Sequence, residues 1–189
     1  MVDSRTIDRK TYYQYDRAYE MIDKYQPQAV VFSDGGPGCR WVGNENGFAG
    51  ATNWSFLRAG EVYPGYPKYR ELQYGHADGN QWVAAECDVS IRPGWFYHPE
   101  EDNRVKTVEQ LTDLYYRSVG HNATLLLNFP VDRNGLIHPV DSANAVDFHK
   151  NIQKQLAHNL LSGVVAEVSD ERGGKYTGVD ESRRHNYGY

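Results

Sequence analysis

The stretch Ala29-Val30-Val31-Phe32-Ser33-Asp34-Gly35-Gly36 decides the fold class that this sequence predicts. An apolar run bounded by turn-forming residues is typical of a buried strand, and this run ends at an acidic residue followed by glycines. The stretch Trp82-Val83-Ala84-Ala85-Glu86-Cys87-Asp88 repeats the arrangement. Side chains at the carboxyl ends of parallel strands line the ligand crevice in α/β folds. We therefore expect Asp34 and Glu86 to face a common crevice.

Further strands and helices are expected on either side of these two stretches. The expected strands cover residues 30–32, 40–42, 82–87 and 123–128, and the expected helices cover 5–25, 107–119 and 142–161. Their order along the chain predicts an α/β fold in which helices connect parallel strands. A closed (β/α) barrel needs eight strands, so four strands predict about half of a barrel or a small complete sheet. The residues from Gly43 to Gln81 are expected to form a long loop.

Composition argues against several classes of function. The net charge of −5 and the lack of a basic stripe argue against nucleic acid as the main partner. No apolar run approaches the roughly 20 residues that span a bilayer, so no membrane partner is expected. The seven histidines are scattered without a metal-binding spacing, and neither a metal nor a cofactor is predicted. Cys39 and Cys87 could form a disulfide, but free buried thiols are the expected state.

The two acidic residues each have a chemical and a structural interpretation. A Glu within an apolar strand is costly to bury unless it is paired or protonated, and a protonated carboxyl is what a general acid needs. The structural alternative for Glu86 is an ion pair with Arg92. For Asp34 the alternative is a tight turn in which the side chain caps its own loop. Two carboxyl groups in one crevice would suit the cleavage of a glycosidic bond.

Two clusters of polar and aromatic residues lie near these acids. The first, residues 40–45, contains Trp41 and Glu45, and the second, residues 92–98, contains Arg92 and Trp95. An aromatic ring beside a carboxylate can contact the apolar face of a sugar. Glu45 is a rival for the second carboxyl, but its Gly- and Asn-rich setting favours a role in binding sugar hydroxyls.

Three stretches together resemble glycoside hydrolase family 29, the α-L-fucosidases. They are residues 30–45, 85–98 and 125–135, and the likeness covers roughly residues 10–175. The stretch Gly35-Gly36-Pro37-Gly38-Cys39-Arg40-Trp41 looks like the subgroup that prefers α-1,3- and α-1,4-linked fucose. The resemblance implies a retaining mechanism, with Asp34 as the nucleophile and Glu86 as the acid/base residue. It also implies a fucosylated oligosaccharide or glycan as the substrate. The expected sugar contacts are Trp41, Glu45, Trp54, Arg92 and Trp95.

The resemblance also carries an expectation about domains. Residues 1–165 resemble the C-terminal half of a catalytic barrel, and residues 166–189 resemble a linker or the start of a C-terminal β domain. The chain is therefore expected to be a fragment that is inactive or feebly active alone and prone to associate, and the missing barrel half is expected in the parent protein. The rival hypothesis is a non-catalytic carbohydrate-binding or degenerate glycosidase-like protein. The first residues lack the form of a signal peptide, so the compartment is not predicted, although the resemblance is compatible with a periplasmic or secreted parent.

Overall fold

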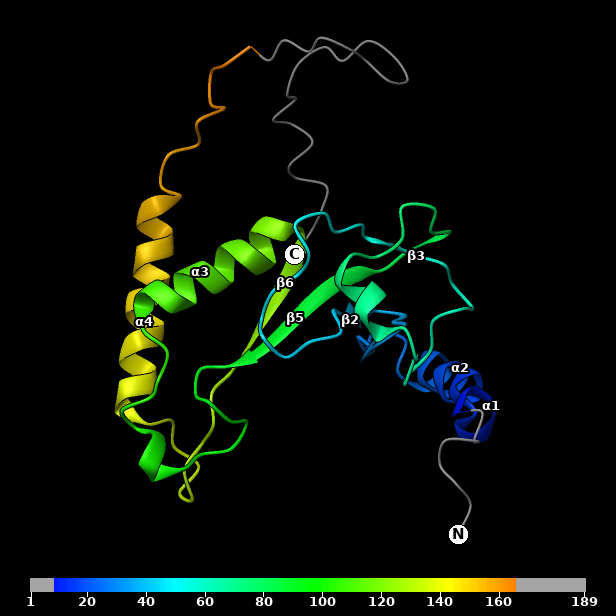
Figure 1. The fold of residues 1–189 in the computed structure, drawn as a ribbon, viewed down its shortest axis with the longest axis horizontal. Helices are drawn as coiled ribbons and strands as arrows, with labels where there is room; N and C mark the ends of the chain where they lie inside the picture. The colour runs from blue at the N-terminus through cyan, green and yellow to red at the C-terminus, as the bar shows by residue number, and fades with distance from the viewer. Residues whose placement is uncertain (1–8, 166–189) are drawn as a thin grey trace. The chain divides into compact units, whose positions relative to one another are not determined.

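The computed structural model describes residues 9–165 of the chain (Figure 1). The chain divides into two compact units after Asn151, and each is considered by itself. The segment 166–189, predicted to be a linker or the start of a β domain, lies outside the described residues. Within residues 9–165, no helix is long and apolar enough to cross a membrane.

The first unit is built on a four-stranded parallel sheet. Its strands, in spatial order, are β1 (Phe32–Ser33), β2 (Cys39–Trp41), β5 (Ala84–Ser90) and β6 (Ala123–Asn128). All three pairings are parallel, so the prediction of an α/β fold with parallel strands is confirmed. This sheet is open, with β1 and β6 at its edges.

The helices differ from the predicted ones mainly at their ends. The α-helices are α1 (Arg9–Tyr13), α2 (Tyr15–Tyr25), α3 (Val108–Ser118) and α4 (Pro139–Gln155), and the short 3-10 helices are η2 (Tyr69–Gln73), η3 (Pro99–Glu101) and η4 (Val119–His121). The predicted helix at 5–25 is divided at Gln14, whose φ of 52° is left-handed and interrupts the helical backbone. Thr107 begins α3 with a capping box, because its hydroxyl and the Gln110 side chain each accept the other residue's backbone N–H.

The segment predicted as a long loop contains regular structure. Its strand β3 (Phe56–Leu57) pairs antiparallel with β4 (Gln81–Trp82), so the strand predicted at 82–87 is in fact two strands that belong to different sheets. The fully buried Arg40 holds this segment against the parallel sheet. Its guanidinium donates to the carbonyls of Leu72 (3.1 Å) and Val83 (2.7 Å) and to the Asn53 side chain. Burying an arginine is tolerated here because these acceptors satisfy its donors.

The two faces of the parallel sheet have different surroundings. On one face, Val89 of β5 packs with Leu111 and Leu114 of α3, and Leu127 of β6 and Phe148 of α4 join this core. Because side chains alternate along a strand, Glu86, Asp88 and Ser90 lie on the other face. Over β5 and β6 the apolar face is buried by α3 and α4, so the polar face is the place where we look for a ligand site.

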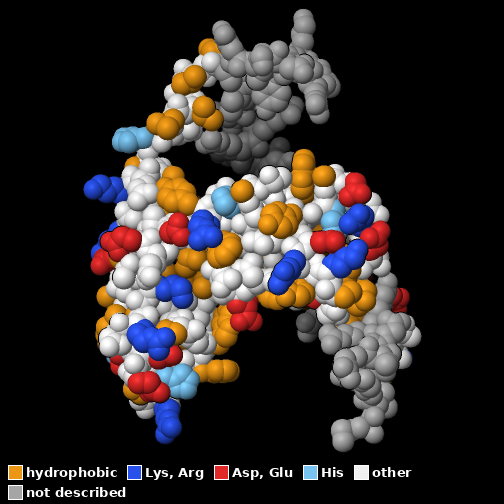
Figure 2. Space-filling view, viewed as in Figure 1, with side chains coloured by type: hydrophobic (Ala, Val, Ile, Leu, Met, Phe, Trp, Pro, Cys, Tyr) orange, Lys and Arg blue, Asp and Glu red, His pale blue; other side chains and the backbone are white. Residues whose placement is uncertain are grey.

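The charged side chains on the surface are of mixed sign. Lys, Arg, Asp and Glu side chains are interspersed over the face drawn in Figure 2. Among the described residues on this face, no broad patch has a single sign.

Candidate active site

A row of side chains crosses the polar face of the parallel sheet. Glu86 of β5 pairs in register with Trp41 of β2 and with Thr124 of β6. Ser33 of β1 pairs with Arg40, and Asp34 is the turn residue that follows β1 directly. Neighbouring strands are about 4.8 Å apart, so the Cα atoms of Asp34 and Glu86, two strands apart, are separated by on the order of 10 Å. Glu86 thus lies in this row, and Asp34 lies at the carboxyl end of the strand next but one to it.

The carboxyl group of Glu86 is held through one of its two oxygens. Oε2 accepts from the Cys39 thiol at 3.4 Å and from the Thr124 hydroxyl at 3.3 Å. Oε1 accepts no hydrogen bond from the described residues. β5 begins at Ala84, so Glu86 is its third residue, and the strand continues to Ser90. The prediction that Glu86 ends its strand is therefore wrong. Its side chain is half-buried, and its contact with a ligand stays a prediction.

The thiols of Cys39 and Cys87 are free and buried, as predicted. Burial raises the pKa of Cys39 to about 12, and the nearby Glu86 carboxylate and its hydrogen bond add to the rise. Burial likewise raises the pKa of Cys87 to about 12. Cys39 therefore stays protonated and remains a hydrogen-bond donor to Glu86.

Asp88 is a third carboxyl of the site that the sequence analysis did not single out. Its Oδ1 accepts the indole N–H of Trp41 at 2.7 Å. Burial is the largest cause of the raised pKa of Asp88; the Trp41 hydrogen bond opposes the rise, and the charges of Glu45 and Glu86 reinforce it. The signal that could have found it is strand alternation, which places residue 88 on the same face as residue 86.

Glu45 and Trp95 meet although they belong to different loops. The indole N–H of Trp95 donates to Glu45 Oε2 at 2.9 Å. The carbonyl of Trp95 accepts from the Asn128 side chain at 3.0 Å, and the same amide donates to Ser90 at 3.1 Å. These contacts fix the loop after β5 above the polar face, where sequence reasoning expected Glu45 and Trp95.

Asp34 is anchored by backbone rather than by side chains. Its Oδ2 accepts the N–H groups of Gly65 at 2.6 Å and Tyr66 at 3.2 Å. These residues belong to the segment between β3 and β4, so Asp34 does not cap its own loop through these bonds. Oδ1 accepts no hydrogen bond from the described residues, which leaves one oxygen of the carboxylate available.

Two expected sugar contacts have surroundings that differ from those of the residues above. Arg92 is 1% exposed, and its guanidinium is bound by Asp141 (2.7 and 2.8 Å) and Asp102 (2.9 Å). Arg92 is therefore not accessible to a sugar and instead stabilises the loop after β5. Its ion-pair partners are Asp141 and Asp102, so the predicted alternative of an ion pair with Glu86 is wrong. Trp54 is 47% exposed, but no described contact joins its side chain to the other site residues. Residues 9–165 contain no cluster of His, Cys, Asp and Glu that could hold a metal ion.

Comparison with known proteins identifies relatives of this chain. A family model described as "Alpha-L-fucosidase" matches residues 3–154. Alpha-L-fucosidase 1 of Arabidopsis thaliana is 41% identical over 166 residues, which cover 85% of this chain and 31% of the relative. The Putative alpha-L-fucosidase 1 of Oryza sativa subsp. japonica is also 41% identical, over 86% of this chain and 31% of its own length. The chain thus spans about a third of the length of the curated relatives it matches.

Solved structures show the same likeness in three dimensions. A glycoside hydrolase 29 family member from an unknown rumen bacterium superimposes with a TM-score of 0.76 and 45% identity, over 88% of this chain and 29% of that one. A putative alpha-L-fucosidase from Bacteroides thetaiotaomicron gives a TM-score of 0.74 and 42% identity, over 86% of this chain and 36% of that one.

Proposed function

The chain belongs to the alpha-L-fucosidase family, and from this premise we propose that it carries the carboxyl pair of a retaining exo-glycosidase. The reaction is the removal of α-linked L-fucose from oligosaccharides or glycoconjugates. A single observation supports the proposal: Asp34 follows β1 directly, Glu86 lies on β5 two strands away in the same parallel sheet, and each has a carboxyl oxygen that accepts no hydrogen bond from the described residues.

Asp34 is the proposed nucleophile and Glu86 the proposed acid/base residue. The Asp34 carboxylate attacks the anomeric carbon while Glu86 donates a proton to the leaving oxygen. Glu86 then takes a proton from the water that releases the sugar from Asp34. Retaining enzymes need the two carboxyl groups about 5–5.5 Å apart. Cα atoms on the order of 10 Å apart are compatible with that separation.

The remaining residues of the face fit the binding of a sugar. Trp41 offers an aromatic ring beside Glu86, and Glu45 with Trp95 offers a carboxylate next to a second ring. Rings favour the apolar face of a sugar, and carboxylates accept hydrogen bonds from its hydroxyls. The proposed sugar contacts are therefore Trp41, Glu45 and Trp95, whereas Arg92 acts by positioning their loop.

Two finer features are proposed as well. The four-stranded sheet is proposed to be part of a (β/α) barrel, because parallel strands with helices on the outer face are the unit from which such barrels are built. The preference for α-1,3- and α-1,4-linked fucose is proposed from the stretch 35–41. A panel of fucosides that differ only in linkage tests this preference.

The catalytic roles are tested by substitution in the full-length natural polypeptide. Asp34→Ala should lower kcat for 4-nitrophenyl α-L-fucoside by at least about a thousandfold, because no other described carboxylate takes its place at the end of β1. Glu86→Ala should lower turnover as well, and added azide should restore it by attacking the sugar-bound intermediate to give the fucosyl azide. Asp113→Ala is the control, since Asp113 is an exposed carboxyl on α3.

The outcomes separate an enzyme from a binding protein. Retention of activity in Asp34→Ala would refute the nucleophile assignment. A wild-type protein that binds methyl α-L-fucoside without hydrolysing any fucoside would favour the alternative of a non-catalytic carbohydrate-binding protein.

A further inference from the structure

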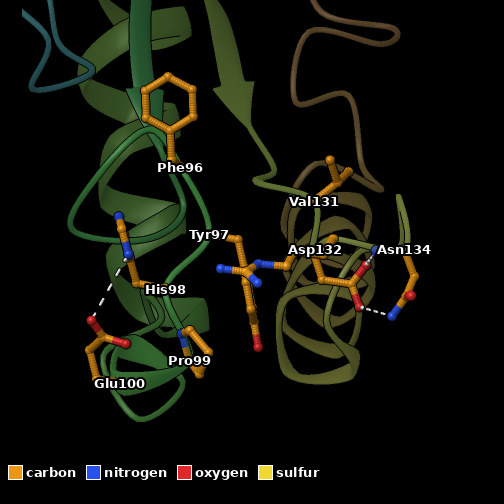
Figure 3. A pocket seen from close by; sticks show the side chains of 9 residues that line it. Phe96, Tyr97, His98, Pro99, Glu100, Val131, Asp132 and Asn134 are labelled. Atoms are coloured by element: carbon orange, nitrogen blue, oxygen red, sulfur yellow. Dashed lines mark hydrogen bonds and ion pairs between the residues drawn. The ribbon is translucent and has the colours of Figure 1, made fainter.

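Two sets of loops contact residues of the candidate active site, and each has its own support. Residues 96–100 after β5 and residues 131–134 after β6 enclose a hollow of about 690 Å³ (Figure 3). The buried guanidinium of Arg92 supports that side, because it donates to the carbonyl of His98 at 3.3 Å. Asp34 is held from the other set, the segment between β3 and β4. The contacts that support this segment therefore bear on the proposed nucleophile.

The carboxylate of Asp34 is bound by a single turn of this segment. Oδ2 accepts the N–H groups of Gly65 at 2.6 Å and of Tyr66 at 3.2 Å. The φ of Gly65 is 83°, and successive N–H groups at such a left-handed turn form a concave site for an anionic oxygen. Because both N–H groups bind Oδ2, the proposed nucleophile attacks through Oδ1, which accepts no hydrogen bond from the described residues. The direction in which Oδ1 points therefore depends on where the turn lies.

Tyr66 connects this turn to the interior. Its side chain is 8% exposed and packs with three buried residues, Leu57, Leu72 and Val83. The hydroxyl at the far end of the ring donates to Glu71 Oε2 at 3.3 Å. A residue that is packed along its ring and bonded at its tip cannot shift without moving its own backbone N–H. The contact with Glu71 therefore fixes the N–H that binds Asp34.

Glu71 is in turn held by a buried histidine. His76 is 6% exposed, and its Nε2 lies 3.4 Å from Glu71 Oε2. Its Nδ1 accepts the backbone N–H of Arg58 at 3.1 Å. Because an N–H group only donates, Nδ1 has no proton, and Nε2 carries the proton and donates to Glu71. Burial acts to raise the pKa of Glu71, but the hydrogen bond from His76 and the charge of Lys68 lower that pKa below its usual value. Glu71 therefore stays ionised and accepts from both Tyr66 and His76.

We propose that Tyr66, Glu71 and His76 are positioning residues for Asp34. The two hydrogen bonds to Glu71 hold the Tyr66 ring, the ring holds the turn, and the turn orients Oδ1 toward the anomeric carbon. This inference rests on the proposed function, because the orientation matters only where Asp34 attacks a sugar. A network with a merely structural role would stabilise the segment without changing the rate of that attack.

The rate at which Asp34 attacks a sugar tests the proposal directly. With 2-deoxy-2-fluoro-α-L-fucosyl fluoride, Asp34 Oδ1 forms a bond to the anomeric carbon, and fluoride leaves with the electron pair of the carbon–fluorine bond. The fluorine that remains on the sugar slows hydrolysis of the ester, so the labelled protein accumulates. Fluoride is a good leaving group that needs little help from an acid, so the labelling rate reports on the nucleophile. Mass spectrometry of the full-length natural polypeptide measures this rate.

Tyr66→Phe removes the hydroxyl and keeps the ring in its apolar surroundings. Its labelling rate constant should fall at least about fivefold, and the inhibition constant of free L-fucose should change less than about twofold, because a small displacement of the nucleophile slows attack without removing a sugar contact. Tyr74→Phe is the matched control, since Tyr74 is a 52% exposed tyrosine of the same segment, and it should be labelled like the wild type. Equal labelling rates for wild type and Tyr66→Phe, or equal losses in Tyr66→Phe and Tyr74→Phe, would overturn the proposal.

A second set of variants tests the two residues behind Tyr66. Glu71→Ala should slow labelling at least about tenfold, because it removes the acceptor of two hydrogen bonds. Glu71→Gln should lie between Glu71→Ala and the wild type, since its amide oxygen still accepts. His76→Leu, which removes the donor to Glu71, should slow labelling as well. Glu61→Ala is the control, because Glu61 is a 62% exposed acid that lies 3.5 Å from Arg58 in the same segment. Labelling of Glu71→Ala or His76→Leu as fast as Glu61→Ala would overturn the role of the residue replaced.

The position of the label separates this inference from the proposed function. A wild-type protein that is not labelled at Asp34 would refute the proposed nucleophile, and the positioning role with it. Labelling of Asp34 at one rate in every variant would keep Asp34 as the nucleophile and overturn the positioning role alone. Easier unfolding of Tyr66→Phe in urea, with an unchanged labelling rate, would likewise assign the network to stability only.

Discussion

Replacing Asp141 with Asn should cost more stability than most single substitutions in this chain. Asp141 and Arg92 have no exposed side-chain area, and their two hydrogen bonds of 2.7 and 2.8 Å form a bidentate pair. Removing one partner of a buried pair typically costs about 3–5 kcal/mol, because the other charge is left buried without compensation. Asp102 remains on Arg92 at 2.9 Å, so the lower end of that range, about 3 kcal/mol, is expected for Asp141→Asn.

The matched control is Asp102→Asn. The Asp102 side chain is 36% exposed, so its bond to Arg92 is screened by water and its loss should cost about 1 kcal/mol or less. Urea denaturation, followed by circular dichroism, measures the free energy of unfolding of each variant. Equal losses for Asp141→Asn and Asp102→Asn would refute the reasoning that burial makes Asp141 the principal partner of Arg92. They would also reopen the possibility that Arg92 is available to a sugar.

Three further perturbations follow from the same structure. The pKa of Cys39 rises from 9.0 to about 12, so its alkylation by iodoacetamide at pH 8 should be about a thousandfold slower than that of a free thiol. The alkylation rate should increase about tenfold for each pH unit, and it should also increase in Glu86→Gln. Mass spectrometry of the labelled protein measures the rate, and rapid labelling of the folded protein would contradict the prediction. Leu111→Ala should lower the free energy of unfolding by about 2–5 kcal/mol, because Leu111 is fully buried. Thr107→Ala should lower it by only about 1 kcal/mol, because it removes the N-cap of α3. A larger loss for Thr107→Ala than for Leu111→Ala would contradict the packing of α3. Gly75→Ala should destabilise the chain, since its φ of +61° is left-handed and a Cβ would collide with the carbonyl of Trp54; an unchanged melting temperature would count against this backbone geometry.

The strands and helices that carry clear local signals were predictable. The strand at 123–128 has the predicted bounds, because a continuous apolar run is a signal that needs no knowledge of its neighbours. The α3 helix lies one residue inside each end of its prediction, since Thr107 is a strong N-cap. The segment from 43 to 81 was missed, because β3 is two residues long and is stabilised by a partner far along the chain.

The residues of the candidate site also divide into those that local sequence predicted and those that it missed. Asp34, Glu86 and Trp95 were predicted from the residues around them and from the resemblance, and their roles stay predictions. Asp88 was missed because the strand was predicted to end at residue 87. The alternation of side chains that places Asp88 on the same face as Glu86 was therefore not applied to it. Arg92 was predicted as a sugar contact, but its pairing with Asp141 joins residues 49 positions apart, which local pattern cannot reveal.

Local chemistry along the chain was thus sufficient for the class of fold and the free cysteines, and it put forward the two acids whose roles are proposed. The register that pairs Trp41 with Glu86, the burial of Arg92 and the hollow beside Phe96 came from the folded chain alone. The physical reason is that a strand or a cap depends on neighbouring residues, whereas register, burial and cavities depend on segments that meet only after the backbone has folded.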